Sequence, residues 1–289
     1  MKKMLITGAS GFIGKNIRER LSQQYEILVP SRAELDLLDA GAVEKYFDNQ
    51  KLDIVIHTAV QRTLGLSEEH ERQVLHNNLV MFCNLERCRE YYDKMIFLGS
   101  GAEYDKGTYL PLMKEEYFGH AVPSDDYGLS KYIMTKISES SRNIFNLRLF
   151  GVFGPYEDYN YRFISNSICK MLRGKDIIIH RNVRFDYLYI KDFCNILDRF
   201  LGIEPRFRNY NVCTGVPVDL LTIAELIQEL LDTKNKIIVE KQGMGYEYSG
   251  DNSRIMQEIG DYQFMDMKRS IAELIDFYKH NDFELKGNY

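Results

Sequence analysis

Tyr127 and Lys131 stand four residues apart, and Ser100 precedes them at the end of an apolar segment. In a helix, residues at this spacing share one face, with Cβ atoms about 5–6 Å apart. A phenol, with an ordinary pKa of about 10, is a poor acid or base at neutral pH, but a neighbouring ammonium favours the phenolate and lowers that pKa. The hydroxyl of Ser100 would hold a substrate oxygen against Tyr127. The pattern therefore predicts proton exchange with a carbonyl or an alcohol.

A second chemical pattern is the glycine-rich segment Thr7-Gly8-Ala9-Ser10-Gly11-Phe12-Ile13-Gly14, which directly follows an apolar stretch. Gly8 permits a tight turn, Gly11 lets the backbone approach a pyrophosphate, and Gly14 lets a helix lie close to a strand. A phosphate then meets the free N–H groups and the dipole of a helix N-terminus. The segment predicts a dinucleotide-binding loop that includes Ser10, Phe12 and Ile13; the alternative is a glycine turn without a ligand.

The end of the second expected strand indicates which dinucleotide binds. It reads Val29-Pro30-Ser31-Arg32, with no acid to hold the ribose 2′-hydroxyl of NAD, and Glu34 follows after the strand should have ended. Ser31 and Arg32 can donate to the 2′-phosphate of NADP. The sequence thus favours NADP(H), with NAD(H) as the alternative and a solvated Arg32 as the other interpretation. Tyr127 would exchange a proton while the nicotinamide exchanges a hydride, and Lys131 would also donate to the nicotinamide ribose.

Short apolar strands and amphipathic helices alternate through the first part of the chain. The expected strands are 4–6, 27–29, 54–57, 96–98 and 147–149, and the expected helices are 13–21, 42–47, 78–91 and 127–138. This alternation predicts an α/β fold, a Rossmann-type doubly wound parallel sheet over residues 1–160, with helices on both faces.

Residues 161–289 are expected to form a smaller C-terminal α/β substrate-binding part, interleaved with the first. Its expected elements are helices near 163–172, 190–200, 221–231 and 267–278 and a strand at 177–179. With no long linker between the two parts, we expect a cleft where the second part meets the C-terminal ends of the strands.

Composition excludes several classes of function. The chain has 289 residues, of which 45% are apolar and 27% charged, and a net charge of −5. This balance predicts no general attraction to nucleic acid or to an anionic membrane, and no apolar run approaches the length of about 18 residues that a membrane span needs. The five cysteines and six histidines show no metal-ligand spacing. Because the cysteines and histidines lack this spacing, we expect no metal. Thr7-Gly8 interrupts the short apolar N-terminal stretch before it could serve as a signal sequence, so we also expect a cytoplasmic protein.

Together these patterns resemble an extended short-chain dehydrogenase/reductase of the nucleotide-sugar epimerase, dehydratase and reductase branch. The resemblance covers nearly the whole chain. Besides the glycine loop, Ser100 and the Tyr–Lys pair, it rests on residues 35–39, 57–60, 77–78, 148–155, 184–192, 210–215 and 251–254. It implies a nucleotide-diphosphate sugar as substrate.

The resemblance also implies roles for further residues. Those expected to border the cofactor are Asp36 and Leu37 at the adenine, Thr58, Ala59 and Val60 at the ribose and diphosphate, and Asn78 at the start of a helix. On the substrate side it implies Ser100, Arg162 and Arg184, with Arg184 as a phosphate donor unless it forms an interdomain salt bridge instead. Relatives often dimerise through the helix of Tyr127 and the helix before it. Leu79, Phe82, Leu85, Ile133 and Ile137 fit such a homodimer interface or a buried core equally well.

The type of reaction is indicated by departures from the family pattern. Dehydratases of the family carry adjacent acids just after the hydroxyl residue, where this chain has Gly101 and Ala102, with Glu103 displaced by one step. The chain most resembles GDP-fucose synthase and other 4-keto-sugar reductases. The Cys and His with which that enzyme epimerises C3 and C5 correspond here to Ala102 and Arg162.

These departures leave three functions open. The preferred one is NADPH-dependent reduction of a nucleotide-linked 4-keto(-6-deoxy) sugar. The first alternative is an NAD-dependent nucleotide-sugar 4-epimerase, which needs the same three catalytic residues, and the second is a non-catalytic NADP-sensing protein. Gly151 replaces an Asn that usually contacts substrate in this family, so the sugar and the nucleotide base stay open.

Overall fold

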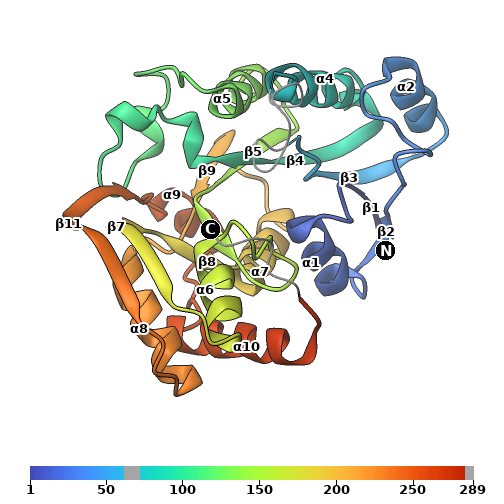
Figure 1. Cartoon of the computed structure of the whole chain (residues 1–289). Helices are drawn as coiled ribbons and strands as arrows, with labels where there is room; N and C mark the ends of the chain where they lie inside the picture. The colour runs from blue at the N-terminus through green and yellow to red at the C-terminus, as the bar shows by residue number, and fades with distance from the viewer. Residues whose placement is uncertain (62–71, 284–289) are drawn as a thin grey trace.

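A six-stranded parallel sheet organises the first part of the molecule. The computed structural model describes residues 1–61 and 72–283. The strand order is β2 (Tyr25–Leu28), β1 (Lys2–Thr7), β3 (Leu52–His57), β4 (Tyr92–Ser100), β5 (Ile144–Leu149) and β9 (Asn209–Val212), and neighbouring strands pair in parallel (Figure 1). The predicted α/β fold with a doubly wound parallel sheet is confirmed.

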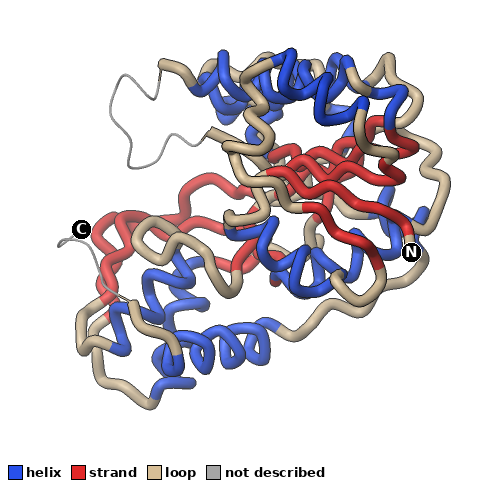
Figure 2. The backbone as a smooth tube through the Cα atoms, turned by 90° about the vertical axis from the view of Figure 1, so that its right-hand side faces the viewer, coloured by secondary structure: helices blue, strands red, loops and turns tan. Residues whose placement is uncertain are grey.

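Helices cover both faces of this sheet because alternate strand residues point to opposite sides. Met4 and Ile6 of β1 pack into one apolar cluster with α1 (Phe12–Leu21) and α7 (Ile190–Leu201). Leu5, between them, packs into the other cluster, with α2 (Ala40–Asp48), α4 (Val74–Arg87) and α5 (Asp126–Ser138). The two layers lie on opposite sides of the strands in Figure 1 and Figure 2.

The second part of the chain builds a smaller unit on this framework. Its helices are α6 (Phe163–Leu172), α8 (Leu220–Leu231), α9 (Ser253–Ile259) and α10 (Met267–His280). Its strands are β7 (Ile177–Phe185), β10 (Val218–Asp219) and β11 (Ile237–Tyr248), in the order β10-β7-β11, together with the separate pair β6 (Gly151–Phe153) and β8 (Tyr187–Tyr189). The apolar cluster under α1 and α7 continues without a break into α6, α8 and α10. The two parts therefore share one core, although the boundary at residue 160 stays a prediction.

Short 3-10 turns complete the described chain at Arg89–Tyr91 (η1), Gly101–Glu103 (η2), Lys106–Thr108 (η3) and Glu115–Tyr117 (η4). Within residues 1–61 and 72–283, no helix has both the length and the apolar character that a bilayer crossing needs. The same residues contain no cluster of three or more His, Cys, Asp or Glu side chains that could hold a metal ion, and His70 lies outside them.

Candidate active site

The glycine loop packs tightly between β1 and the residues after β3. Gly8 has a φ of 71°, and a Cβ there would come within 2.6 Å of the Ala59 nitrogen. The Thr58 hydroxyl donates to the carbonyls of Thr7 at 2.7 Å and Gly8 at 3.2 Å. Helix α1 then begins after Gly11 with no side-chain cap and no acid in its first turn. This shape and charge fit a dinucleotide pyrophosphate.

The end of β2 differs from the expectation in one respect. Glu34 folds back and accepts hydrogen bonds from the N–H of Ser31 at 2.7 Å and from its hydroxyl at 2.8 Å. These bonds lower the pKa of Glu34, so a carboxylate does lie at the strand tip. Arg32 remains exposed, with its Nε 3.6 Å from a carboxylate oxygen of Asp36.

The other residues that were expected to border the cofactor either line this edge of the sheet or support it. Leu37 is buried, and its carbonyl accepts a hydrogen bond from Asn84 of α4 at 2.8 Å. Asn78 is also buried and bonds both the N–H and the carbonyl of Gln61, at 2.8 and 3.2 Å. It therefore anchors the segment that follows Val60, a supporting role.

The structure brings the three residues expected at the catalytic centre together. Ser100 ends β4, and its hydroxyl forms a hydrogen bond with Tyr127 in the first turn of α5. Asp125 caps this helix by accepting from the N–H of Gly128 at 2.9 Å, which fixes where the helix starts. Lys131 lies one turn further, with its Nζ 5.9 Å from the centre of the Tyr127 ring and 2.8 Å from the carbonyl oxygen of Leu98, to which it donates.

Burial dominates the protonation of these groups. It raises the pKa of Tyr127, and the hydrogen bond to Ser100 and the charge of Arg162 oppose only part of this shift. The expectation of a pKa lowered by the neighbouring ammonium is therefore wrong for the protein without a nicotinamide, because the phenol is desolvated and the ammonium is directed to Leu98. A protonated Tyr127 is the form that can give a proton to a carbonyl oxygen. Burial also lowers the pKa of Lys131 to about 8, against the charge of Glu103.

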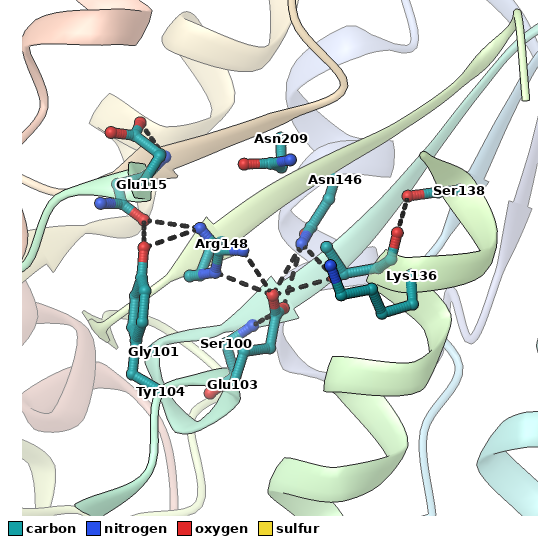
Figure 3. Close-up of polar contacts among 12 residues, drawn as sticks. Ser100, Gly101, Glu103, Tyr104, Glu115, Lys136, Ser138, Asn146, Arg148 and Asn209 are labelled. Atoms are coloured by element: carbon teal, nitrogen blue, oxygen red, sulfur yellow. Dashed lines mark hydrogen bonds and ion pairs between the residues drawn. The ribbon is translucent and has the colours of Figure 1, made fainter. Parts of the chain in front are cut away.

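The side chain of Glu103, the displaced acid of the family motif, lies among Ser100, Asn146 and Arg148 (Figure 3). Its side chain is fully buried in an ion pair with Arg148, whose Nη2 lies 2.7 Å from the carboxylate. The other two residues of η2 are Gly101 and Ala102, neither of which can transfer a proton. The site thus has no acid at the positions where dehydratases of the family carry theirs.

An aromatic wall, which sequence reasoning missed, stands opposite Tyr127. We use this name for Tyr248 together with Tyr109, Phe150 and Phe185. The ring centroids of these three residues lie 5.1 to 5.5 Å from that of Tyr248. The Tyr248 hydroxyl forms a hydrogen bond with Ser100, and a Cβ on Gly101 would lie 2.5 Å from it. Only the count of 20 tyrosines hinted at this wall, because β11, which carries Tyr248, was not expected.

The two arginines expected at the substrate are placed differently. Arg162 precedes α6 and is exposed, and its charge acts on Tyr127 and Tyr248, so it lies near the catalytic centre. Arg184 is exposed on β7 beside Phe185, and neighbouring residues of a strand point to opposite faces. Because the Phe185 ring packs on Tyr248, Arg184 points away from the wall. Within the part of the chain that the structure describes it forms no ion pair, and its role as a phosphate donor stays a prediction.

A hollow of about 390 Å³ lies along β7 and β11, the strands that end at Phe185 and Tyr248. Its lining includes Phe163, His180, Arg181 and Tyr246, and the Tyr246 ring is 6.3 Å from that of Phe185. The hollow and the wall thus share one strand pair.

Comparison with known proteins gives a consistent result. The model of the family described as "NAD dependent epimerase/dehydratase family" matches residues 4–213. The chain is 23% identical to GDP-L-colitose synthase of Yersinia pseudotuberculosis, over 97% of this chain and 100% of that protein. It is 24% identical to a putative UDP-glucose 4-epimerase of Methanocaldococcus jannaschii, over 96% and 99%. A solved GDP-mannoheptose C4 reductase from Campylobacter jejuni with NADP bound superposes with a TM-score of 0.82, at 19% identity and over 96% and 98% of the two chains.

Proposed function

Because the chain belongs to the NAD dependent epimerase/dehydratase family, we propose that it reduces the 4-keto group of a nucleotide-diphosphate sugar with NADPH. One observation carries this proposal. Ser100 and a protonated Tyr127 share a hydrogen bond at the end of β4, while Glu103, the acid that follows Ser100 by three residues, is fully buried in an ion pair with Arg148. This arrangement supports proton delivery to a carbonyl, and it does not support removal of water from a hexose.

The chemistry that bound NADPH would supply in the proposed reaction is a hydride for C4 of the sugar. Tyr127 gives its phenol proton to the C4 oxygen, and Ser100 donates a second hydrogen bond to that oxygen as negative charge develops. Lys131, which donates to the Leu98 carbonyl in this structure, would hold the nicotinamide ribose. The N–H groups at the start of α1 would hold the pyrophosphate. Tyr248 would share a hydrogen bond with Ser100 from the opposite side and so fix the direction of the serine hydroxyl.

The proposed substrate lies between the aromatic wall and Arg162, with its nucleotide toward the hollow along β7 and β11. Rings of the wall offer an apolar surface for a sugar ring, and Arg162 offers a positive charge for the diphosphate. The names of the colitose synthase and of the Campylobacter reductase support testing GDP-linked 4-keto sugars first.

The experiment that tests this function supplies purified protein with NADPH and a GDP-linked 4-keto-6-deoxy sugar. We expect one NADPH consumed per molecule of product, and no 4-keto sugar formed from a plain nucleotide hexose. Because Ala102 and Arg162 stand where the epimerising Cys and His would be, a product made in D₂O should carry no deuterium at C3 or C5.

A 4-epimerase is the second candidate, and Glu34 is the observation that favours it. Its carboxylate lies at the tip of β2, where NAD-binding folds place an acid for the ribose. Interconversion of C4 epimers without net use of cofactor would establish this candidate and contradict the reductase.

The cofactor prediction concerns Arg32. In Arg32→Ala, NADPH affinity should fall roughly ten- to hundredfold, because the 2′-phosphate loses one charge-assisted hydrogen bond. NADH lacks this phosphate, so its affinity in the same variant should hardly change and serves as the control. Fluorescence titration of both cofactors checks the prediction. Equal affinities of the parent for NADPH and NADH would contradict it.

We also propose that the protein is a cytoplasmic homodimer. Phe82 and Leu85 are fully buried within one chain, so they belong to its own core. Leu79 of α4 and Ile133 and Ile137 of α5 are only partly buried, which leaves an apolar surface on the two helices that the family resemblance implicates.

A further inference from the structure

We propose that Glu103 is a positioning residue for the reductase: from beneath the active site, its carboxylate keeps Lys131 in the ammonium state and fixes the backbone of Ser100. The inference deepens the proposed function and rests on it. It assigns a task to Glu103, the displaced acid of the family motif, whose side chain is fully buried.

The contacts of Glu103 join the two elements that carry the catalytic residues. Its carboxylate accepts from the Ser100 N–H at 3.0 Å, at the end of β4. It also accepts from the hydroxyl of Thr135 at 2.9 Å, and Thr135 lies one helical turn beyond Lys131 on α5. Figure 3 shows bonds from Ser100, Asn146 and Arg148 converging on the carboxyl group of Glu103.

Strand β5 holds the same carboxylate from the other side. The Nε of Arg148 donates to it at 2.8 Å, and the Nδ2 of Asn146 donates to both of its oxygens at 3.0 Å. Glu103, Arg148, Asn146 and Thr135 are all fully buried. We call these four residues the buried network.

Stability alone is a weak reason for such an arrangement. Replacing a buried ion pair with apolar side chains of similar volume is often neutral or stabilising, because desolvation of the charges offsets their attraction. This network instead ends at the backbone of Ser100 and at the helix face of Lys131. Its position supports a task at the site.

Burial lowers the pKa of Lys131 and so disfavours its ammonium form, whereas the negative charge of Glu103 raises that pKa and favours the ammonium. The other ionisable groups around it do not replace that charge. His57 of β3 is neutral, because burial lowers its pKa to about 3, and Tyr127 of α5 is protonated. Arg148 is bound to Glu103 itself, and Asp125 and Arg162 act on Tyr127. Tyr104 and Glu115 act on Arg148.

The test compares three variants with the parent by following NADPH binding and single-turnover NADPH oxidation across pH. Glu103→Gln removes the charge and keeps the size. Because it leaves Arg148 unpaired, Glu103→Gln/Arg148→Met is made beside it and carries the same prediction. Thr135→Val is the matched control, since it removes the hydroxyl that donates to the carboxylate and accepts from Asn146 but leaves the charge of Glu103.

In the parent, binding and rate should weaken as the pH rises through about 8, where Lys131 loses its proton. We call this decline with rising pH the limb. Without the charge of Glu103 the ammonium of Lys131 is less favoured, so the midpoint of the limb should move to lower pH by about one unit in both Gln variants. In Thr135→Val the midpoint of thermal unfolding should fall while the limb stays in place. A purely structural role for Glu103 would lower stability in all three variants without moving the limb.

An unmoved limb in both Gln variants, or an equal shift in Thr135→Val, would overturn the proposal. Failure of the proposed function gives a different result: the parent would bind NADPH with the expected limb but oxidise none of it with a 4-keto sugar. The pH dependence of NADPH binding in the Gln variants would then still test the role of Glu103.

Discussion

Replacing Tyr127 with Phe should slow single-turnover oxidation of NADPH by about 10²–10⁴-fold at saturating 4-keto sugar, the usual contribution of general acid catalysis. The substitution keeps the ring of Tyr127 in its packing and removes only the hydroxyl that shares a hydrogen bond with Ser100. NADPH affinity should stay within a few-fold, because the proposed contacts of the phenol are to the substrate.

The aromatic wall provides a matched control for this prediction. Tyr248 bonds the same serine from the other side and is not on the proposed proton path. Tyr248→Phe loses one hydrogen bond of ordinary strength, so its rate should fall by about tenfold or less. Rates that fall equally in the two variants would mean that both phenols merely hold Ser100, and an unchanged rate in Tyr127→Phe would make Tyr127 a packing residue.

The largest expected effect on stability comes from Arg148→Met. It leaves the carboxylate of Glu103 buried without its cation, and breaking a buried pair in this way costs about 3–5 kcal/mol. Urea denaturation should show this loss in the free energy of unfolding. The double variant Glu103→Gln/Arg148→Met should recover part of it, because no unpaired charge stays buried.

A surface pair sets the scale for comparison. Arg269 and Glu273 of α10 lie 3.6 Å apart with the arginine 72% exposed. Exposed pairs of this kind contribute about 0.2–1 kcal/mol, so Arg269→Met should change the free energy of unfolding by no more than that. A similar small loss in Arg148→Met would show that water or a rearranged side chain compensates Glu103.

The parts of the fold predicted from the sequence are those governed by local pattern. The expected strands at 4–6 and 54–57 lie within β1 and β3, because continuous apolar runs between helices are typical of buried parallel strands. The glycine loop and the four-residue spacing on α5 likewise depend on residues close in the sequence. For such features the chain itself carries the information.

What the sequence did not predict depends on contacts between distant residues. Strand β11 is mostly exposed and has two register irregularities along β7, so neither apolar runs nor strict alternation mark it. Tyr248 reaches Ser100 only because these strands pair. Nothing in the sequence pairs Glu103 with Arg148, because its counter-charge comes from the distant strand β5. The contact of Glu34 with Ser31 depends on a turn whose conformation the residue types alone do not specify.

The fit between Gly101 and Tyr248 bears on how this chain could evolve. A side chain at position 101 would collide with the Tyr248 hydroxyl, which lies 2.5 Å from the place of the missing Cβ. An acid at position 101 therefore requires both Tyr248 and Phe150, whose ring atoms lie 2.8 Å from the same place, to shift or be replaced, and loss of the Tyr248 hydroxyl removes a partner of Ser100. Substitutions at positions 101 and 248 should therefore act on the site together and not independently, because the two residues are in contact.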